Sequence, residues 1–215
     1  ILAQGVIATV PVNFVAVGSG DFNNDGFEDI LWRNAAGKSF ISYMNGIQES
    51  SRSSVFSIAT NLVLQGVADY DGDGVADLLL RAPSGYVYVL LMSTTGAYLM
   101  PVAIASNNYQ IVGVGDYTGD SKNDILFRHS YSSLITIFSN PISVNNELLT
   151  SSNGVAAKQV IQKSGDFDGD GKADLLLRHS TTGVITKAKL VINSGYLSLQ
   201  YSAPLGTVPL TFAAQ

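Results

Sequence analysis

The residues of this chain best suited to chemistry are its aspartates, which lie in four short segments of one pattern. The segments are DFNNDGFED (21–29), DYDGDGVAD (69–77), DYTGDSKND (116–124) and DFDGDGKAD (166–174), and together they hold every aspartate of the chain. Carboxylates this close together repel one another. A hard cation such as Ca²⁺, which takes about six to eight oxygen ligands, turns that repulsion into a binding site. The pattern therefore predicts four cation-binding loops.

Side-chain oxygens at positions 1, 3, 5 and 9 of each loop, with the backbone carbonyl of position 7, could surround one ion. The predicted ligands, loop by loop, are Asp21, Asn23, Asp25, Phe27 and Asp29; Asp69, Asp71, Asp73, Val75 and Asp77; Asp116, Thr118, Asp120, Lys122 and Asp124; and Asp166, Asp168, Asp170, Lys172 and Asp174. Glycine at position 6 permits a sharp turn, and the third loop has Ser121 there instead. We expect three to four Ca²⁺ ions, one per loop, with the third loop weakest.

Other interpretations of the loops fit the sequence less well. An EF-hand begins with a similar pattern but needs a bidentate Glu at position 12 and flanking helices. Position 12 lies inside an apolar run and is Trp32, Leu80, Phe127 or Leu177. Mg²⁺ is less suitable than Ca²⁺ because it keeps more of its water ligands. Metal-free hairpin turns would explain one loop, but hardly four copies that hold every aspartate.

The loops mark a repeat, since their first aspartates are 48, 47 and 50 residues apart. Between them lie short runs rich in Val, Ile, Phe and Tyr, bounded by Gly, Asn and Ser, without a helical period. Four strands in such a length form one propeller blade. We predict a single all-β domain over residues 1–215, a β-propeller or partial propeller. Its four blades of four antiparallel strands would span about 11–58, 59–106, 107–156 and 157–205, with an extra strand at each end, 1–10 and 206–215.

The composition limits which classes of partner and site the chain can have. The formal net charge is −5, and no basic cluster is present, which argues against a nucleic-acid partner. Cysteine is absent, which excludes disulfides, thiolate metal sites and a cysteine nucleophile. The apolar start, ILAQGVIATVPVNFVAV, is a poor signal peptide and is short for a membrane span. The chain does not begin with Met, so a processed product or a piece of a longer protein is expected.

The loops and the ILWR, LLLR and ILFR runs that follow them resemble the FG-GAP/VCBS-type repeat of integrin-α-like β-propellers. The resemblance covers about residues 11–205. It implies calcium in a loop between the first and second strands of each blade, ligands on the opposite face, and an extracellular or cell-surface location of the bacterial secreted type. Integrin-like propellers have seven blades. The four blades here could close by using a terminal strand, or the ring could be completed by other blades of a longer chain, which we favour, or by another subunit.

Further residues recur with the repeat and are expected to be structural. An arginine follows each loop at Arg33, Arg81, Arg128 and Arg178, and it could brace the blades by donating to carbonyls. The two histidines, His129 and His179, share one repeat position, where a structural role is favoured over a ligand pocket. Trp32 and the aromatic residues after each first aspartate are expected to pack in the core. Every aspartate lies in the predicted calcium loops, so a Ser-His-Asp triad would have to use a calcium ligand as its acid. We therefore do not expect an enzyme.

These observations together predict an extracellular calcium-binding repeat module for adhesion, protein–protein interaction or surface assembly. Calcium would make the blade loops rigid. The partner would be a protein or glycan bound on the face opposite the calcium loops. A carbohydrate-binding, lectin-like propeller and an accessory domain of a larger secreted enzyme remain the alternatives.

Overall fold

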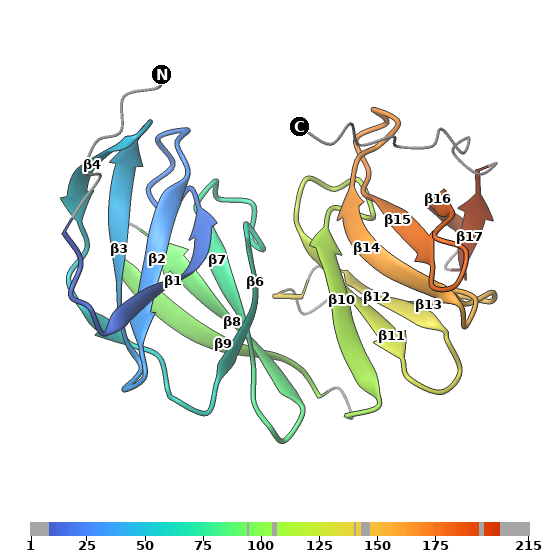
Figure 1. The fold of residues 1–215 in the computed structure, drawn as a ribbon, viewed down its shortest axis with the longest axis horizontal. Helices are drawn as coiled ribbons and strands as arrows, with labels where there is room; N and C mark the ends of the chain where they lie inside the picture. Colours follow the sequence, from blue (N-terminus) through green and yellow to red (C-terminus); the bar gives the residue numbers. More distant parts are fainter. Residues whose placement is uncertain are drawn as a thin grey trace, which may run out of the picture. The chain divides into compact units, whose positions relative to one another are not determined.

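The computed structural model describes residues 9–93, 95–104, 107–139, 141–142, 147–193 and 196–202. These residues form strands and no helix, and the strands make four antiparallel sheets of the blade type (Figure 1). The all-β prediction with four strands per blade is therefore confirmed. Most of the two predicted flanking strands, 1–8 and 206–215, lies outside the described residues, and residues 9 and 10 belong to no strand.

Each sheet follows the chain in simple up-and-down order. The first contains β1 (Phe14–Gly20), β2 (Asp29–Asn34), β3 (Lys38–Asn45) and β4 (Gln48–Arg52), with the short β5 (Phe56–Ser57) also paired to β3. The second contains β6 (Val63–Ala68), β7 (Asp77–Arg81), β8 (Tyr86–Ser93) and β9 (Gly96–Ile104). The third contains β10 (Tyr109–Gly115), β11 (Asp124–His129), β12 (Ile135–Ser139) and β13 (Glu147–Thr150). The fourth contains β14 (Gln159–Gly165), β15 (Asp174–His179), β16 (Ile185–Asn193) and β17 (Tyr196–Tyr201).

The sheets pair off into two compact units. Unit 1 comprises Ile1–Asn107 and Asn140–Val144, and unit 2 comprises Asn108–Ser139 and Asn145–Gln215. Each unit contains its own apolar core between two sheets. The core residues face the neighbouring sheet because the second strands are apolar on both sides, as expected for stacked blades. The prediction of one domain over residues 1–215 stays a prediction.

The first strand of each sheet has a bulge at the same place. In all four sheets the register with the second strand shifts by one residue, between Ala16 and Gly18 in β1 and at the equivalent positions of β6, β10 and β14. Beyond the bulge, β1 and β10 approach the next sheet closely. A Cβ on Gly20 would lie 2.6 Å from Cβ of Ala76, and one on Gly115 would lie 2.9 Å from Cβ of Ala173. Only glycine fits at these two contacts.

Candidate metal centres

Every aspartate-rich loop joins the first strand of its sheet to the second. The last aspartate of each loop is the first residue of the second strand, for example Asp29 in β2 and Asp77 in β7. Each loop contains left-handed residues at positions 4 and 6, which in the second loop are Gly72 with φ 81° and Gly74 with φ 87°. The third loop places Ser121, at position 6, in the same region with φ 66°. The turn predicted for position 6 is therefore present in every loop, including the one without glycine there.

The carboxylate at position 1 organises the loop backbone. One of its oxygens accepts a hydrogen bond from the N–H of position 6 in all four loops, at 2.8 Å for Asp21, 2.9 Å for Asp69, 2.8 Å for Asp116 and 3.0 Å for Asp166. The carboxylate at position 5 likewise accepts from the N–H of position 7, where Phe27, Val75, Lys122 and Lys172 stand. The loop thus has a fixed shape that leaves its remaining oxygens to face a ligand.

The carboxylate at position 9 is buried in every loop. Asp29, Asp77 and Asp124 are 0% exposed, and Asp174 is 1% exposed. One oxygen of each accepts a hydrogen bond from the N–H of position 2, at distances from 2.9 to 3.2 Å. Position 9 is therefore a structural acceptor as well as a predicted ligand, which the sequence alone did not indicate.

Two loops bring three acids together. Within the described residues, ligand oxygens of Asp69, Asp71 and Asp77 lie within 4.8 Å of one another, and those of Asp166, Asp168 and Asp174 do the same. Oδ1 of Asp174 is buried and accepts no hydrogen bond. A buried carboxylate oxygen without a donor favours a cation nearby. The second and fourth loops therefore fit a hard metal ion.

The first and third loops do not form a group of this kind. In the first, the amide of Asn23 donates to Oδ2 of Asp25 at 2.9 Å, so this part of the predicted ligand set is already hydrogen-bonded. In the third, Oγ1 of Thr118 is buried and without a hydrogen-bond partner, although Thr118 stands at ligand position 3. An oxygen in that state is compatible with a ligand role, but the neighbouring acids are not gathered as they are in the second and fourth loops.

Burial raises the pKa of two aspartates in the second loop. It raises the pKa of Asp77 to about 7, since the backbone donors do not outweigh the loss of solvent and the nearby Asp71 adds to the rise. Burial also raises the pKa of Asp71, and the adjacent carboxylates add to the effect. In the first loop, burial raises the pKa of Asp29 in the same way. At neutral pH Asp77 therefore retains part of its proton, which a bound cation would displace.

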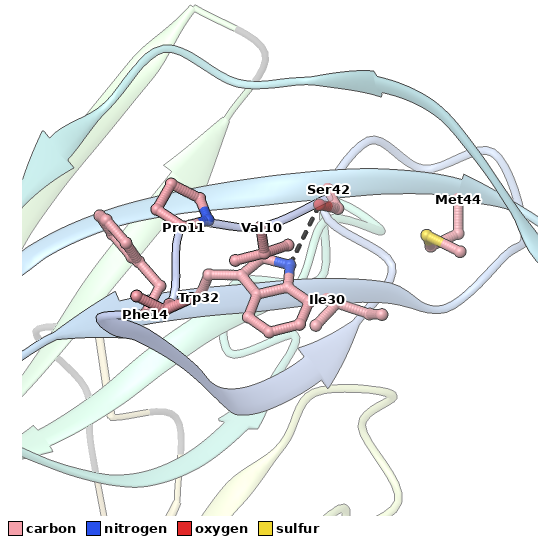
Figure 2. Close-up of a pocket in the computed structure, with 8 residues that line it drawn as sticks. Val10, Pro11, Phe14, Ile30, Trp32, Ser42 and Met44 are labelled. Atoms are coloured by element: carbon pink, nitrogen blue, oxygen red, sulfur yellow. Dashed lines mark hydrogen bonds between the residues drawn. The ribbon is translucent and has the colours of Figure 1, made fainter. Parts of the chain in front are cut away.

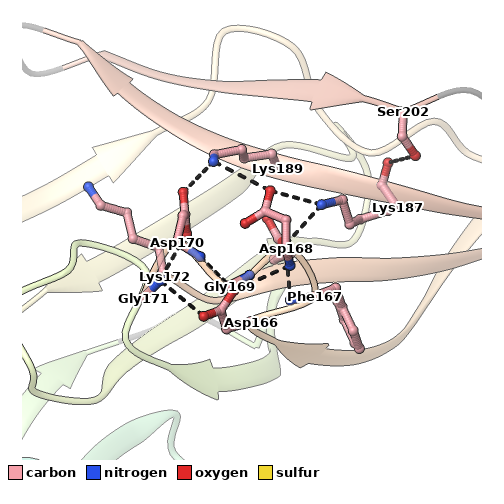
Figure 3. Close-up of polar contacts among 11 residues, drawn as sticks. Asp166, Phe167, Asp168, Gly169, Asp170, Gly171, Lys172, Lys187, Lys189 and Ser202 are labelled. Carbon is pink, nitrogen blue, oxygen red and sulfur yellow. Dashed lines mark hydrogen bonds and ion pairs between the residues drawn. The ribbon is translucent and has the colours of Figure 1, made fainter.

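The fourth loop contacts lysines from a neighbouring strand (Figure 3). Nζ of Lys187 lies 2.9 Å from Oδ2 of Asp168 and 3.4 Å from Oδ2 of Asp174. Nζ of Lys189 contacts Oδ2 of Asp170 and lies 3.5 Å from Oδ2 of Asp168. A hydrogen bond from Lys187 holds the pKa of Asp168 below its usual value. Both lysines lie on β16, the third strand of the sheet.

Within each unit the two loops are joined directly. The N–H of Ala76 donates to the carbonyl of Asp21 at 2.7 Å, and the N–H of Ala173 donates to the carbonyl of Asp116 at 2.6 Å. Because the acceptor belongs to position 1 of the preceding loop, the order of one loop is transmitted to the next.

Arg33 and Arg128 brace the end of their sheets opposite the aspartate loops, as predicted. Arg33 donates to the carbonyls of Leu62 at 2.9 Å and Ala59 at 2.9 Å, which lie in the connection to β6. Arg128 donates to the carbonyl of Gln159 at 3.0 Å, at the start of β14. Arg178, in the fourth sheet, is exposed.

The histidines close tight turns. Nδ1 of His129 accepts from the N–H of Ser132 at 3.0 Å, and Nδ1 of His179 accepts from the N–H of Thr182 at 3.2 Å. In the first sheet, Oδ1 of Asn34 has the same role, accepting from the N–H of Lys38 at 3.0 Å. The shared repeat position is therefore explained by the turn between the second and third strands, in agreement with the structural interpretation.

Two aromatic predictions need correction. Trp32 is half-buried, and it lines an apolar pocket of about 400 Å³ on the first sheet, where its Nε1 donates to Oγ of Ser42 at 3.0 Å (Figure 2). Phe167 is 46% exposed, whereas its counterpart Phe22 is 3% exposed. Phe22 packs in the core against residues of the next sheet, such as Ala76. No further sheet follows the fourth one within the described residues.

Comparison with known proteins identifies the repeat. The profile of the FG-GAP-like repeat matches residues 21–80 and 69–127, so both matches begin at the first aspartate of a loop. The chain contains FG-GAP-like repeats. The predicted family resemblance is thus confirmed, and the position of each loop between the first two strands agrees with it. The fourth loop lies beyond these matches, and it keeps the same backbone contact between positions 1 and 6 as the third.

No curated protein matches the sequence significantly. Among solved structures, the fold is similar to that of a chain in the crystal structure of BBS1N in complex with ARL6DN, with 10% sequence identity and a TM-score of 0.48. The match covers 91% of this chain and 56% of that chain. The described residues include no helix long and apolar enough to cross a membrane.

Proposed function

We propose that this FG-GAP-like protein is an extracellular calcium-binding repeat module that serves adhesion, protein–protein interaction or surface assembly. FG-GAP repeats are typical of extracellular and surface proteins that bind other proteins. The absence of cysteine is compatible with a module stabilised by ions instead of disulfides.

The observation that carries the proposal is the geometry of the second loop. Asp69, Asp71 and Asp77 come from both ends of the loop, yet their oxygens lie within 4.8 Å of one another. The pKa of Asp77, raised to about 7 by burial, means that the metal-free cluster is electrostatically unfavourable when fully ionised. A divalent cation supplies the missing positive charge, and carboxylate oxygens are the ligands that Ca²⁺ prefers.

The residues of the chain would then convert ion binding into rigidity. Asp77 is bound to the backbone of β8 through the N–H of Met92, at 2.8 Å, and the loop is bound to its predecessor through Ala76 and Asp21. Fixing the second loop therefore also fixes the junction between the two sheets of unit 1. A partner would then bind to loops that are already ordered, so binding would not include the entropic cost of ordering them.

We place the partner surface at the end of the sheets away from the aspartate loops. In unit 2 this end carries an aromatic group in which His129 lies 4.8 Å from Tyr109 and 6.0 Å from Tyr131, measured between ring centroids. Tyr131 is 82% exposed, and tyrosine is enriched in protein interfaces.

The test is a calorimetric titration of Ca²⁺ into metal-stripped protein, with thermal unfolding in excess Ca²⁺ and in EDTA. We expect binding with affinity near the extracellular range of about 10⁻⁴–10⁻³ M. Calcium at 100 times its Kd would stabilise the fold by about 2.7 kcal/mol per site. The double variant Asp71→Asn/Asp73→Asn should lose one site, whereas Glu28→Gln, an exposed acid outside the ligand set, should keep all sites. Unfolding that is the same in Ca²⁺ and EDTA, without binding heat, would refute the proposal.

A further inference from the structure

The third strand of the fourth sheet differs from the other three at two positions. The register between the second and third strands shows which positions of the four sheets are equivalent. The equivalents of Lys187 and Lys189 are Ile41 and Tyr43 in the first sheet, Val89 and Leu91 in the second, and Ile137 and Ser139 in the third. Only the fourth sheet places charged residues there. The sequence signal is the alternation Lys-Ala-Lys at 187–189, which brings both ammonium groups to the same face of β16.

We infer that Lys187 and Lys189 are built-in counter-ions of the fourth loop, so that this loop is a low-affinity calcium site and the second loop the high-affinity one. The inference rests on the proposed calcium-binding function and assigns different roles to two loops with the same aspartates at positions 1, 3, 5 and 9.

The lysines contact the oxygens that a cation would need. Nζ of Lys187 is within 3.4 Å of both Asp168 and Asp174, which are two of the three acids in the fourth-loop group. Figure 3 shows both lysine side chains reaching from β16 toward the loop, Lys187 to Asp168 and Lys189 to Asp168 and Asp170. Lys172, in the loop itself, extends away from them. The ammonium of Lys187 thus lies between ligands of the predicted ion.

Calcium and these lysines compete for the same carboxylates. An ion among the fourth-loop acids would lie a few ångströms from Nζ of Lys187 and would repel it. Binding therefore requires Lys187 to withdraw and its ion pairs with Asp168 and Asp174 to break. Breaking these ion pairs subtracts from the free energy of calcium binding, so the affinity of the loop falls.

Beside the second loop, the counterpart of Lys189 is Leu91, which lines an open hollow. The hollow has a volume of about 400 Å³ and is lined by Asp71, Asp73 and Leu91 together with residues of the β8–β9 hairpin. None of the described residues that line it is basic. Val89, the counterpart of Lys187, is 0% exposed and apolar. Neither Val89 nor Leu91 on β8 therefore competes with an ion for the carboxylates of the second loop.

The consequence is a graded response. At low calcium, Lys187 and Lys189 keep the fourth loop closed, while β8 offers the second loop no lysine at the equivalent positions. As calcium rises, the second loop fills first, and the fourth fills only when calcium can displace the lysines. Unit 1 is then the calcium-dependent part of the module, and unit 2 is partly independent of calcium.

The experiment is a calcium titration followed by two-dimensional amide NMR, which resolves the two sites through the Gly74 and Gly171 resonances. In the unmodified protein we expect Gly74 to reach half of its shift at a calcium concentration at least about tenfold lower than Gly171. The variant Lys187→Gln/Lys189→Gln should move the Gly171 midpoint toward that of Gly74. The control Lys158→Gln/Lys163→Gln makes the same change in net charge at two exposed lysines outside the loop and should leave the order unchanged.

A converse variant keeps the test decisive if the double glutamine variant does not fold. Leu91→Lys places an ammonium beside the second loop and should raise the midpoint of Gly74 several-fold. Equal midpoints in the unmodified protein, or a Gly171 midpoint that ignores removal of the lysines, would overturn the inference while leaving calcium binding intact. Absence of any calcium-dependent shift at both glycines would overturn the proposed function as well.

Discussion

The second and fourth loops contain aspartates at the same four positions, yet they deal with the repulsion among them in different ways. In the second, burial raises the pKa of Asp71 and brings that of Asp77 to about 7, so Asp77 keeps part of its proton at neutral pH. In the fourth, Lys187 lowers the pKa of Asp168, and backbone donors led by the N–H of Gly171 lower that of Asp166. The loop motif determines which oxygens meet, whereas burial in the second loop, and backbone donors and Lys187 in the fourth, shift the pKa values of these acids in opposite directions.

The position-9 aspartates provide the largest test of this contrast. Oδ1 and Oδ2 of Asp77 accept from the buried N–H groups of Met92 and Tyr70, whereas Oδ1 of Asp174 accepts from none. Each buried N–H left without an acceptor costs about 1–3 kcal/mol. We expect Asp77→Ala to lower the free energy of unfolding in EDTA by about 2–6 kcal/mol and Asp174→Ala by about half of that.

Urea unfolding followed by circular dichroism measures both values. Glu28→Gln, outside the hydrogen-bonded set and exposed, is the control and should change stability by less than about 0.5 kcal/mol. A larger loss for Asp174→Ala than for Asp77→Ala would show that the lysine contacts, not the backbone hydrogen bonds, dominate the stability of these acids.

This contrast also marks the limit of the sequence. The loops, their turns and the four-stranded repeats were predictable because their signals are local: aspartate spacing, glycine at position 6 and short apolar runs. Lys187 and Lys189 lie 13 and 15 residues beyond Asp174, and their approach to the loop depends on the register of β15 with β16. Comparing third strands among the repeats would have shown the lysines as unusual, but not where they point.

The buried state of position 9 could have been suspected, since that residue opens an apolar strand. The exposure of Phe167 could not have been predicted in this way. Phe22, at the same repeat position in the first loop, is buried because the next sheet packs against it. Such differences in burial between equivalent residues depend on which sheet packs against which. The sequence of a single repeat therefore does not determine them.

The raised pKa of Asp77 gives a second test, through pH. The folded state retains a proton that the unfolded chain, with an ordinary value of 3.8, has already released. The metal-free protein therefore loses stability as pH rises from about 4 to about 7, and this contribution levels off above pH 7. Calcium binding to the second loop at pH 7 should release about half a proton from Asp77. Calcium binding to the fourth loop should release none from Asp168, because the pKa of Asp168 lies below its usual value.

Calorimetric titrations in buffers of different ionisation enthalpy count these protons. Repeating them at a pH of about 8.5 supplies the control, because Asp77 is then ionised before calcium arrives and the release should fall toward zero. Proton release that persists unchanged at the higher pH would place the titrating group elsewhere than in the second loop.

The smallest expected effect concerns the backbone on which the comparison depends. If all loops share one shape, Ser121 in the third loop has the left-handed conformation that Gly74 and Gly171 have at position 6, and its φ of 66° agrees. A side chain in this region costs about 1 kcal/mol relative to glycine. Ser121→Gly should therefore stabilise the protein by up to about 1 kcal/mol in EDTA, less the entropy that glycine adds to the unfolded chain.

Asn24 is the matched control for this change, since it is also left-handed, with φ 58°. Asparagine tolerates that conformation, and the amide of Asn24 donates to the carbonyl of Asp73 in the next loop at 3.3 Å. Asn24→Gly removes this hydrogen bond, so it should be neutral or slightly destabilising by thermal unfolding. If both substitutions stabilise equally, the gain reflects relief of backbone strain alone, and the hydrogen bond between the first and second loops contributes nothing measurable.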